Sequence, residues 1–267
     1  MRKVLIRLGI VVLVAIVFPF LGGLTIAYGE WSGNSDRRYQ LAGSSGQAPD
    51  AALYSEAIVQ VYAARAARWR GVFGVHSWIA YKKADAAQYV RAEVIGWGAR
   101  YKQTVVVKRN GIPDRYWYGY EPELLAEIRG RDAETAIVRI EALIDQYPFK
   151  NNYQVWPGPN SNTFTAHIAR EVEALEIDLP PTAIGKDWLD ASSGDLFART
   201  PSGTGYQFSL FGLLGILVAA EEGLEINLIG LTIGIDPLDF ALKLPGIGRI
   251  GGIDPDPAAA ATSDAAE

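Results

Sequence analysis

Two residues in this sequence, Ser161 and His76, have the side chains that acyl-transfer chemistry uses. Ser161 stands in the string Asn160-Ser161-Asn162-Thr163-Phe164, where a segment with helical spacing begins. The amides at a helix N-terminus favour negative charge, so they would stabilise a serine alkoxide and the oxyanion that follows. A helix cap formed by Ser161 or by Asn160 is the structural alternative. Both interpretations of Ser161 stay open at this stage.

His76 lies in a segment with strand spacing, 85 residues before Ser161. A histidine can take the proton of a serine that lies within hydrogen-bond reach. Alternation places His76 on one strand face with Trp78, so a place in the core or at its rim is the alternative. Glu93, Asn160 or Asn162 could orient the imidazole. The second histidine, His167, follows Ser161 by six residues, about 120° away around a helix, which predicts a surface or packing role.

Aromatic residues and a glycine define a candidate binding groove. Trp156 precedes Pro157-Gly158-Pro159, and Trp78 lies on the same strand as His76. Gly158 would let the backbone approach a ligand closely. A rigid turn is the alternative for Gly158, and the core is the alternative for the tryptophans.

Composition excludes several classes of function. The chain has no cysteine, which removes disulfides, thiolate metal sites and a cysteine nucleophile. With two histidines, a zinc site would depend on carboxylates, and we expect neither a metal nor a cofactor. The 25 basic and 30 acidic residues give a formal charge of −5, which offers no cationic field to nucleic acid. The 267 residues, 49% of them hydrophobic, fit one globular domain with short appendages.

The N-terminus predicts a membrane anchor. Residues 8–28 carry no charge and are long enough to span a bilayer, and basic residues precede them. This pattern predicts a single-pass membrane protein whose N-terminus is cytoplasmic and whose C-terminal domain lies on the other side of the membrane. A cleaved signal peptide is the alternative. The predicted division is a cytoplasmic tip and anchor at 1–28, a flexible linker at 29–50, a domain at 51–250 and a disordered tail at 251–267.

Hydrophobic spacing predicts an α+β domain with one antiparallel sheet flanked by helices. The apolar stretch at 206–235 favours buried strands with a turn at Glu221-Glu222-Gly223 over a second membrane span. The strands are expected at 56–65, 72–81, 88–97 and 103–108, and the helices at 122–130, 132–147 and 161–175.

Several strings resemble a bacterial family known as domain of unknown function 3750. They are WRGVFGVHSWIAYK (69–82), YPFKNNYQVWPGPNSNTFTAHIARE (147–171), LPPTAIGKDW (179–188) and KLPGIGRIG (243–251). The resemblance extends from Leu53 to Gly251 and implies a membrane-anchored bacterial protein. Together with the predicted span, it implies a single-pass protein of the bacterial inner membrane with a periplasmic C-terminal domain. It implies no activity.

A second resemblance implies chemistry. A strand histidine followed by an Asn-nucleophile string that opens a helix is similar to circularly permuted papain-like proteins, such as the NlpC, lecithin:retinol acyltransferase and PPPDE families. Ser161 occupies the place of their cysteine and His76 that of their base. The resemblance implies a permuted papain-like fold and a serine-dependent hydrolase or acyltransferase that acts on amide or ester bonds of cell-envelope peptide or lipid. Amides near Asn162 would hold the oxyanion. A non-catalytic envelope module that binds through its aromatic groove is the rival hypothesis.

Overall fold

The computed structural model describes residues 42–96 and 104–252, and this part of the chain is mostly β-structure. Strands β1 to β5 form one antiparallel sheet in the order β4-β3-β2-β1-β5. The elements of this first half are β1 (Ile58–Arg65), η1 (Arg68–Val72), β2 (Val75–Lys82), β3 (Val90–Val94), β4 (Val106–Asn110), β5 (Glu123–Arg129), α4 (Gly130–Asp145), α5 (Ser161–Glu171) and η2 (Glu173–Leu175).

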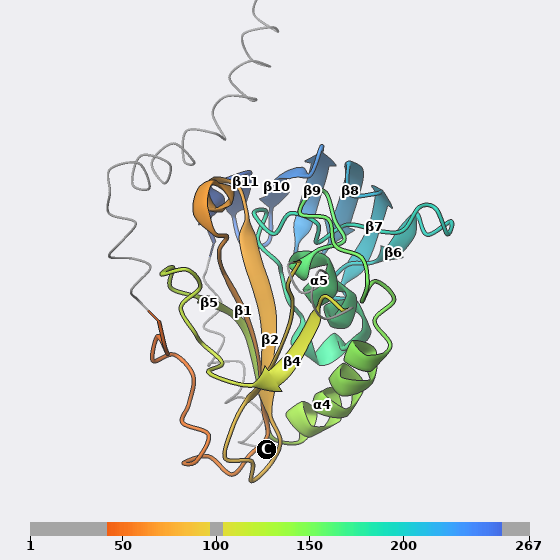
Figure 1. The fold of residues 1–267 in the computed structure, drawn as a ribbon. Helices are drawn as coiled ribbons and strands as arrows, with labels where there is room; N and C mark the ends of the chain where they lie inside the picture. Colours follow the sequence, from red (N-terminus) through yellow and green to blue (C-terminus); the bar gives the residue numbers. More distant parts are fainter. Residues whose placement is uncertain (1–41, 97–103, 253–267) are drawn as a thin grey trace, which may run out of the picture.

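The C-terminal part of the chain forms a second antiparallel sheet, a seven-stranded meander in which each strand pairs with the next (Figure 1). Helix α5 and the loop after it lie between the two sheets, because Arg170 and Lys186 bond to Gln207 and Glu225 of the second sheet. The strands are β6 (Phe197–Arg199), β7 (Gly205–Leu210), β8 (Leu214–Ala219), β9 (Gly223–Leu228), β10 (Leu231–Asp236), β11 (Ala241–Leu244) and β12 (Gly248–Gly251).

The predicted fold class is therefore wrong. A single sheet flanked by helices was expected, in a permuted papain-like arrangement, whereas the structure has two antiparallel sheets and, among the described residues, only the two α-helices α4 and α5. The segment at 122–130, expected as a helix, is strand β5. Its apolar run is too short for periodicity to distinguish the two states, and pairing with β1, from Ile58 opposite Arg129 to Ala63 opposite Glu123, decides for the strand.

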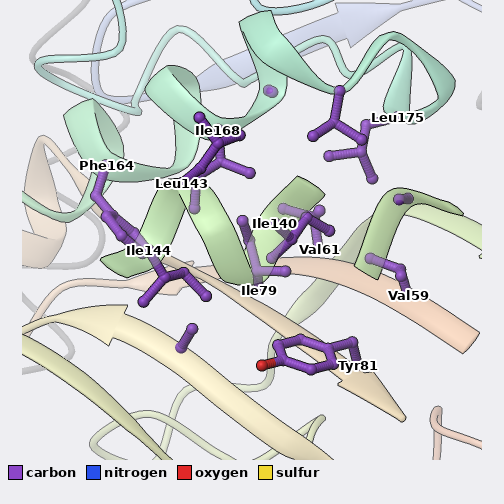
Figure 2. Packing of buried hydrophobic residues seen from close by; sticks show 14 of the residues in the cluster. Val59, Val61, Ile79, Tyr81, Ile140, Leu143, Ile144, Phe164, Ile168 and Leu175 are labelled. Atoms are coloured by element: carbon purple, nitrogen blue, oxygen red, sulfur yellow. The ribbon is translucent and has the colours of Figure 1, made fainter. Parts of the chain in front are cut away.

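The main hydrophobic core lies between the five-stranded sheet and the two helices (Figure 2). Val61 of β1 and Ile79 of β2 pack against Ile140 of α4 and Phe164 of α5, and all four side chains are fully or almost fully buried. Because side chains alternate along a strand, the odd-numbered residues of β1 and β2 face the helices. A second, smaller cluster around Trp78 covers the opposite face of the sheet.

The second sheet is inverted with respect to the usual pattern. Its polar side chains point inward, and its aliphatic side chains point to solvent. The inward face is stabilised by buried ion pairs, in which Glu225 accepts from Lys186 and Lys243 and Lys243 also pairs with Asp178. The prediction of strands and a turn within 206–235 is confirmed, but these strands are buried on one face only.

Within residues 42–96 and 104–252, no helix is long and apolar enough to cross a bilayer. The predicted anchor at 8–28 and most of the predicted linker and tail fall outside these ranges, so they stay predictions. At the described end of the linker, the Gln47 amide and the Ser44 hydroxyl donate to the Asp114 carboxylate.

Candidate functional site

Helix α5 begins at Ser161, and Asn160 is its cap. Asn160 Oδ1 accepts from the amides of Asn162 and Thr163, and the Thr163 hydroxyl accepts from the Asn160 amide, which completes a capping box. Asn160 Nδ2 also donates to the carbonyls of Val155 and Ile184. Of the two capping alternatives, Asn160 is the correct one. Ser161 occupies the first helical position.

Strand β2 is fastened to this end of the helix. Ser77 Oγ lies 2.9 Å from both Asn162 Oδ1 and Thr165 Oγ1, and Asn162 Nδ2 donates to the carbonyls of Val75 and Ile184 at 3.1 and 2.9 Å. The side chains of Ser77, Asn162 and Thr165 are buried, and a well-made hydrogen bond contributes most where water is excluded. The first residues of β2 and the first turn of α5 therefore form one rigid unit.

His76 belongs to a buried polar row on the other face of β2. Its Nε2 lies 3.0 Å from Glu93 Oε2, and Glu93 Oε1 accepts from Arg91 Nε and a terminal nitrogen of Arg91 at 3.0 and 2.6 Å. Burial would raise the pKa of Glu93, but His76 and Arg91 together hold that pKa below its ordinary value. The Trp117 ring stacks on the imidazole, with centroids 3.9 Å apart. Of the three groups expected to orient His76, the structure assigns Glu93.

A cavity of about 920 Å³ lies where β1, η1 and β2 meet the loop before α5 and the β9–β10 turn. It is the size of a site for a drug-sized ligand or larger. His76, Asn160, Ser161 and Asn162 supply polar groups to its wall, and most of the remaining wall is apolar. The aromatic side chains that line it are Trp69, Phe73, Trp117, Tyr118, Tyr153 and Trp156.

Ser161 and His76 reach this cavity from opposite faces of the five-stranded sheet. Ser77 points to α5, so alternation directs its neighbour His76 to the other face, where Trp78 and Trp117 pack. Within the described residues, neither the Ser161 hydroxyl nor His76 makes a hydrogen bond to the other. Both residues line the same cavity at the end of the strands, but no hydrogen bond joins them into a catalytic dyad.

The other predicted site residues divide into two groups. Trp156 lines the cavity, is 48% exposed, and donates from Nε1 to the Ile229 carbonyl. Trp78 is buried in the smaller cluster and does not line the cavity. Gly158 lies outside the lining as well, and its positive φ of 141° and its approach to Trp188 explain the glycine by packing.

The predicted oxyanion site is occupied by the helix cap. The Asn162 amide donates to Asn160 Oδ1 at 2.9 Å, so it is not free to hold an oxyanion. His167 packs edge-on against Tyr147, in agreement with the packing role expected of it.

Several residues of the site were not found by sequence reasoning. Arg91 forms an ion pair with Glu93. The two residues are two positions apart and therefore lie on one face of β3, a spacing that is visible in the sequence. Trp69, Tyr118 and Ile229 contribute exposed side chains to the cavity, but Trp69 comes from η1 and the other two from separate turns, and the three share no motif.

The fold and site define a class: a β protein of two sheets with a largely apolar cavity between them. Residues 56–188 match the family described as Protein of unknown function (DUF3750), and over this region the chain belongs to that family. The expected family is confirmed, although the match ends before β6, short of the Gly251 limit expected from the resemblance. No curated protein and no solved structure matched the chain.

Proposed function

We propose that the protein binds an amphipathic molecule whose apolar chain fills the cavity. The observation that supports this proposal is the lining: a space of about 920 Å³, walled mainly by aromatic and aliphatic side chains with a few polar groups among them. Ligand sites for small molecules have this composition, because apolar walls provide affinity and a few polar groups fix the orientation.

The polar end of the ligand belongs near His76 and the first turn of α5. His76 is held by Glu93 and covered by Trp117, so its ring is fixed before any ligand arrives. Such preorganisation lowers the entropic cost of binding. The ligand class is therefore a lipid or another molecule with an acyl chain and a head group that accepts or donates hydrogen bonds.

A fluorescent fatty acid analogue tests the proposal. Binding should be saturable, and Trp156→Ala should weaken it, because Trp156 lines the cavity. Tyr54→Ala is the matched control, since Tyr54 is an exposed aromatic residue outside the lining. Equal affinity in all three proteins, or no saturable binding to any, would refute the proposal.

A serine-dependent hydrolase or acyltransferase is the second candidate. One observation favours it: Ser161 lines the cavity, and its hydroxyl makes no hydrogen bond to another described residue. Ser161 Oγ would attack an ester or amide carbonyl of a cell-envelope lipid or peptide and expel its alcohol or amine. The hydroxyl proton would pass to His76 through a water, since no hydrogen bond joins His76 to Ser161 directly. Water, or a second alcohol, would then release the acyl group.

A fluorophosphonate probe discriminates the two candidates. An active nucleophile would give a covalent adduct at Ser161 that is lost in Ser161→Ala, while fatty acid binding persists in that variant. Absence of an adduct at Ser161 in the parent protein, with binding intact, would exclude the hydrolase and leave the binding function.

A further inference from the structure

We propose that the outer face of the second sheet lies on a lipid bilayer and that the cavity takes its acyl chain from that bilayer. The outer face is the solvent-facing side of β7 to β12. This inference rests on the proposed function, because it names the source of the ligand.

The outer face is continuous and uncharged. Register places Leu214 opposite Leu228, Ile216 opposite Ile226 and Val218 opposite Leu224, with all six side chains at least two-fifths exposed. The charged residues of these strands, including Glu225 and Lys243, point inward. Monomeric proteins rarely expose contiguous apolar surface of this extent, so the face is expected to be covered.

The inverted orientation is built into the fold. Turning the sheet over would bury its aliphatic residues, but it would break the pairs of Glu225 and Asp178 with Lys186, Lys243 and Arg249. Lys186 lies in the loop after α5, and Arg249 in β12, so the pairs join the sheet to the rest of the domain. The apolar side chains therefore face outward because the polar ones are required inside.

The cavity opens at one end of this face. Leu231 continues the outward-facing row of β10 and also lines the cavity. Ile229, which is 64% exposed, lines the same cavity. The Ile229 amide donates to the Leu213 carbonyl at 2.6 Å, so the β7–β8 and β9–β10 turns form one apolar tip beside the mouth. An acyl chain could pass from the outer face into the cavity along a surface that is apolar throughout.

The acidic residues of the turns are confined to the end of the face opposite the cavity. The turns at that end carry Glu221 and Asp239 beside Leu238 and Phe240, which are 71% and 90% exposed, whereas the turns at the cavity end consist of apolar residues and glycine. A bilayer interface suits this distribution of charge, because the uncharged cavity end enters the acyl region and the carboxylates stay at the level of the head groups and water. The sequence also predicts a membrane span at 8–28, and the 13 residues from 29 to 41 would hold the domain within roughly 45 Å of that span.

Area does not decide between a bilayer and a second copy of the chain. Six strands about 4.8 Å apart and about 20 Å long give roughly 600 Å² per face, and two such faces reach the lower limit of stable protein interfaces. The continuity with the cavity and the confinement of the acidic turn residues to the far end favour the bilayer. A face-to-face dimer would cover Ile229, which lines the cavity.

Site-specific labelling of the full chain tests the proposal, and the lack of any cysteine makes each introduced thiol unique. Ile226→Cys marks the centre of the outer face, Leu213→Cys the tip, and Val138→Cys a control position that is 72% exposed on α4, away from the second sheet (Figure 1). Each variant carries an environment-sensitive fluorophore and is reconstituted into vesicles of phosphatidylcholine and phosphatidylglycerol with spin-labelled lipid as the quencher.

The labels at positions 226 and 213 should lose most of their fluorescence, and the label at 138 should keep it. Absence of quenching at 226 overturns the proposal, even if residues 8–28 hold the protein in the vesicle. Shielding of 226 from iodide without quenching by lipid, together with cross-links between two Ile226→Cys chains, would instead establish a dimer. The Trp156→Ala substitution separates this inference from the proposed function, since it should weaken fatty acid binding and leave the lipid quenching unchanged.

Discussion

Ser77 Oγ lies 2.9 Å from Asn162 Oδ1 and so connects the strand that carries His76 to the helix that begins at Ser161. Each partner of this bond is the immediate neighbour of a candidate site residue. The bond fixes both candidates in place, and it fixes them on opposite faces of the sheet, because Ser77 and His76 point in opposite directions along one strand.

Asn162→Ala should destabilise the protein by about 2 to 4 kcal/mol, because the carbonyls of Val75 and Ile184 and the Ser77 hydroxyl each lose a buried partner. Urea denaturation would measure the change. Asn110→Ala serves as the control, since Asn110 is exposed and its side chain donates one bond to Gln88. A similar loss in both variants would show that the link between β2 and α5 contributes little.

Ser161→Ala should change stability by less than about 0.5 kcal/mol, because its hydroxyl has no hydrogen-bond partner among the described residues. Ser77→Ala should cost about 1 to 3 kcal/mol, since Asn162 Oδ1 and Thr165 Oγ1 both lose their bond to the Ser77 hydroxyl. Thermal unfolding of both variants makes the comparison. A large loss in Ser161→Ala would mean that Ser161 has a structural role.

Glu93→Gln should destabilise the protein by about 3 to 5 kcal/mol at neutral pH, because it leaves the buried Arg91 cation without its carboxylate. The pKa of Glu93 is lowered in the folded state, so its contribution is complete above the pKa of the unfolded chain and is lost as the pH falls. The difference between the parent protein and the variant should therefore shrink below about pH 4. Urea denaturation midpoints of the parent protein and the variant, measured from neutral pH to below about pH 4, test this expectation. A difference that does not change with pH would contradict the role assigned to Glu93.

Lys243→Met removes a cation that Glu225 and Asp178 share inside the second sheet. Burial alone would raise the pKa of Glu225, and Lys186 and Lys243 hold it below its ordinary value. Without Lys243, the ionised side chains of Glu225 and Asp178 lose a buried counter-ion, so we expect the free energy of unfolding to fall by about 3 to 5 kcal/mol at neutral pH. This loss should decrease as the pH falls, because protonation neutralises both carboxylates.

Lys83→Met is the control for this variant, because Lys83 pairs with Glu141 at the surface. It should cost less than about 1 kcal/mol at any pH. Equal losses at positions 83 and 243 would show that the ion pairs behind the inverted sheet are not required for its orientation.

Local signals in the sequence were sufficient for much of the first half of the fold. The alternation around Val59, Val61 and Ile79 predicted β1 and β2, and the apolar stripe of Ile137, Ile140 and Ile144 predicted α4. The start of α5 was correct as well, because a cap is a contact between residues two or three positions apart. The segment at 122–130 was not decided locally, since only pairing with β1 makes it a strand.

By itself, the sequence determined the family, the strands and helices with strong periodicity, and the residue types available for chemistry. Tertiary structure decided which face of each strand is covered. An alternating strand such as β9 has the same pattern whichever side is buried, and the choice depends on ion pairs between residues 18 to 65 positions apart, such as Glu225 and Asp178 with Lys243. The relation of His76 to Ser161 was decided in the same way, because the side of the sheet on which α5 packs is set by the whole core and not by either residue.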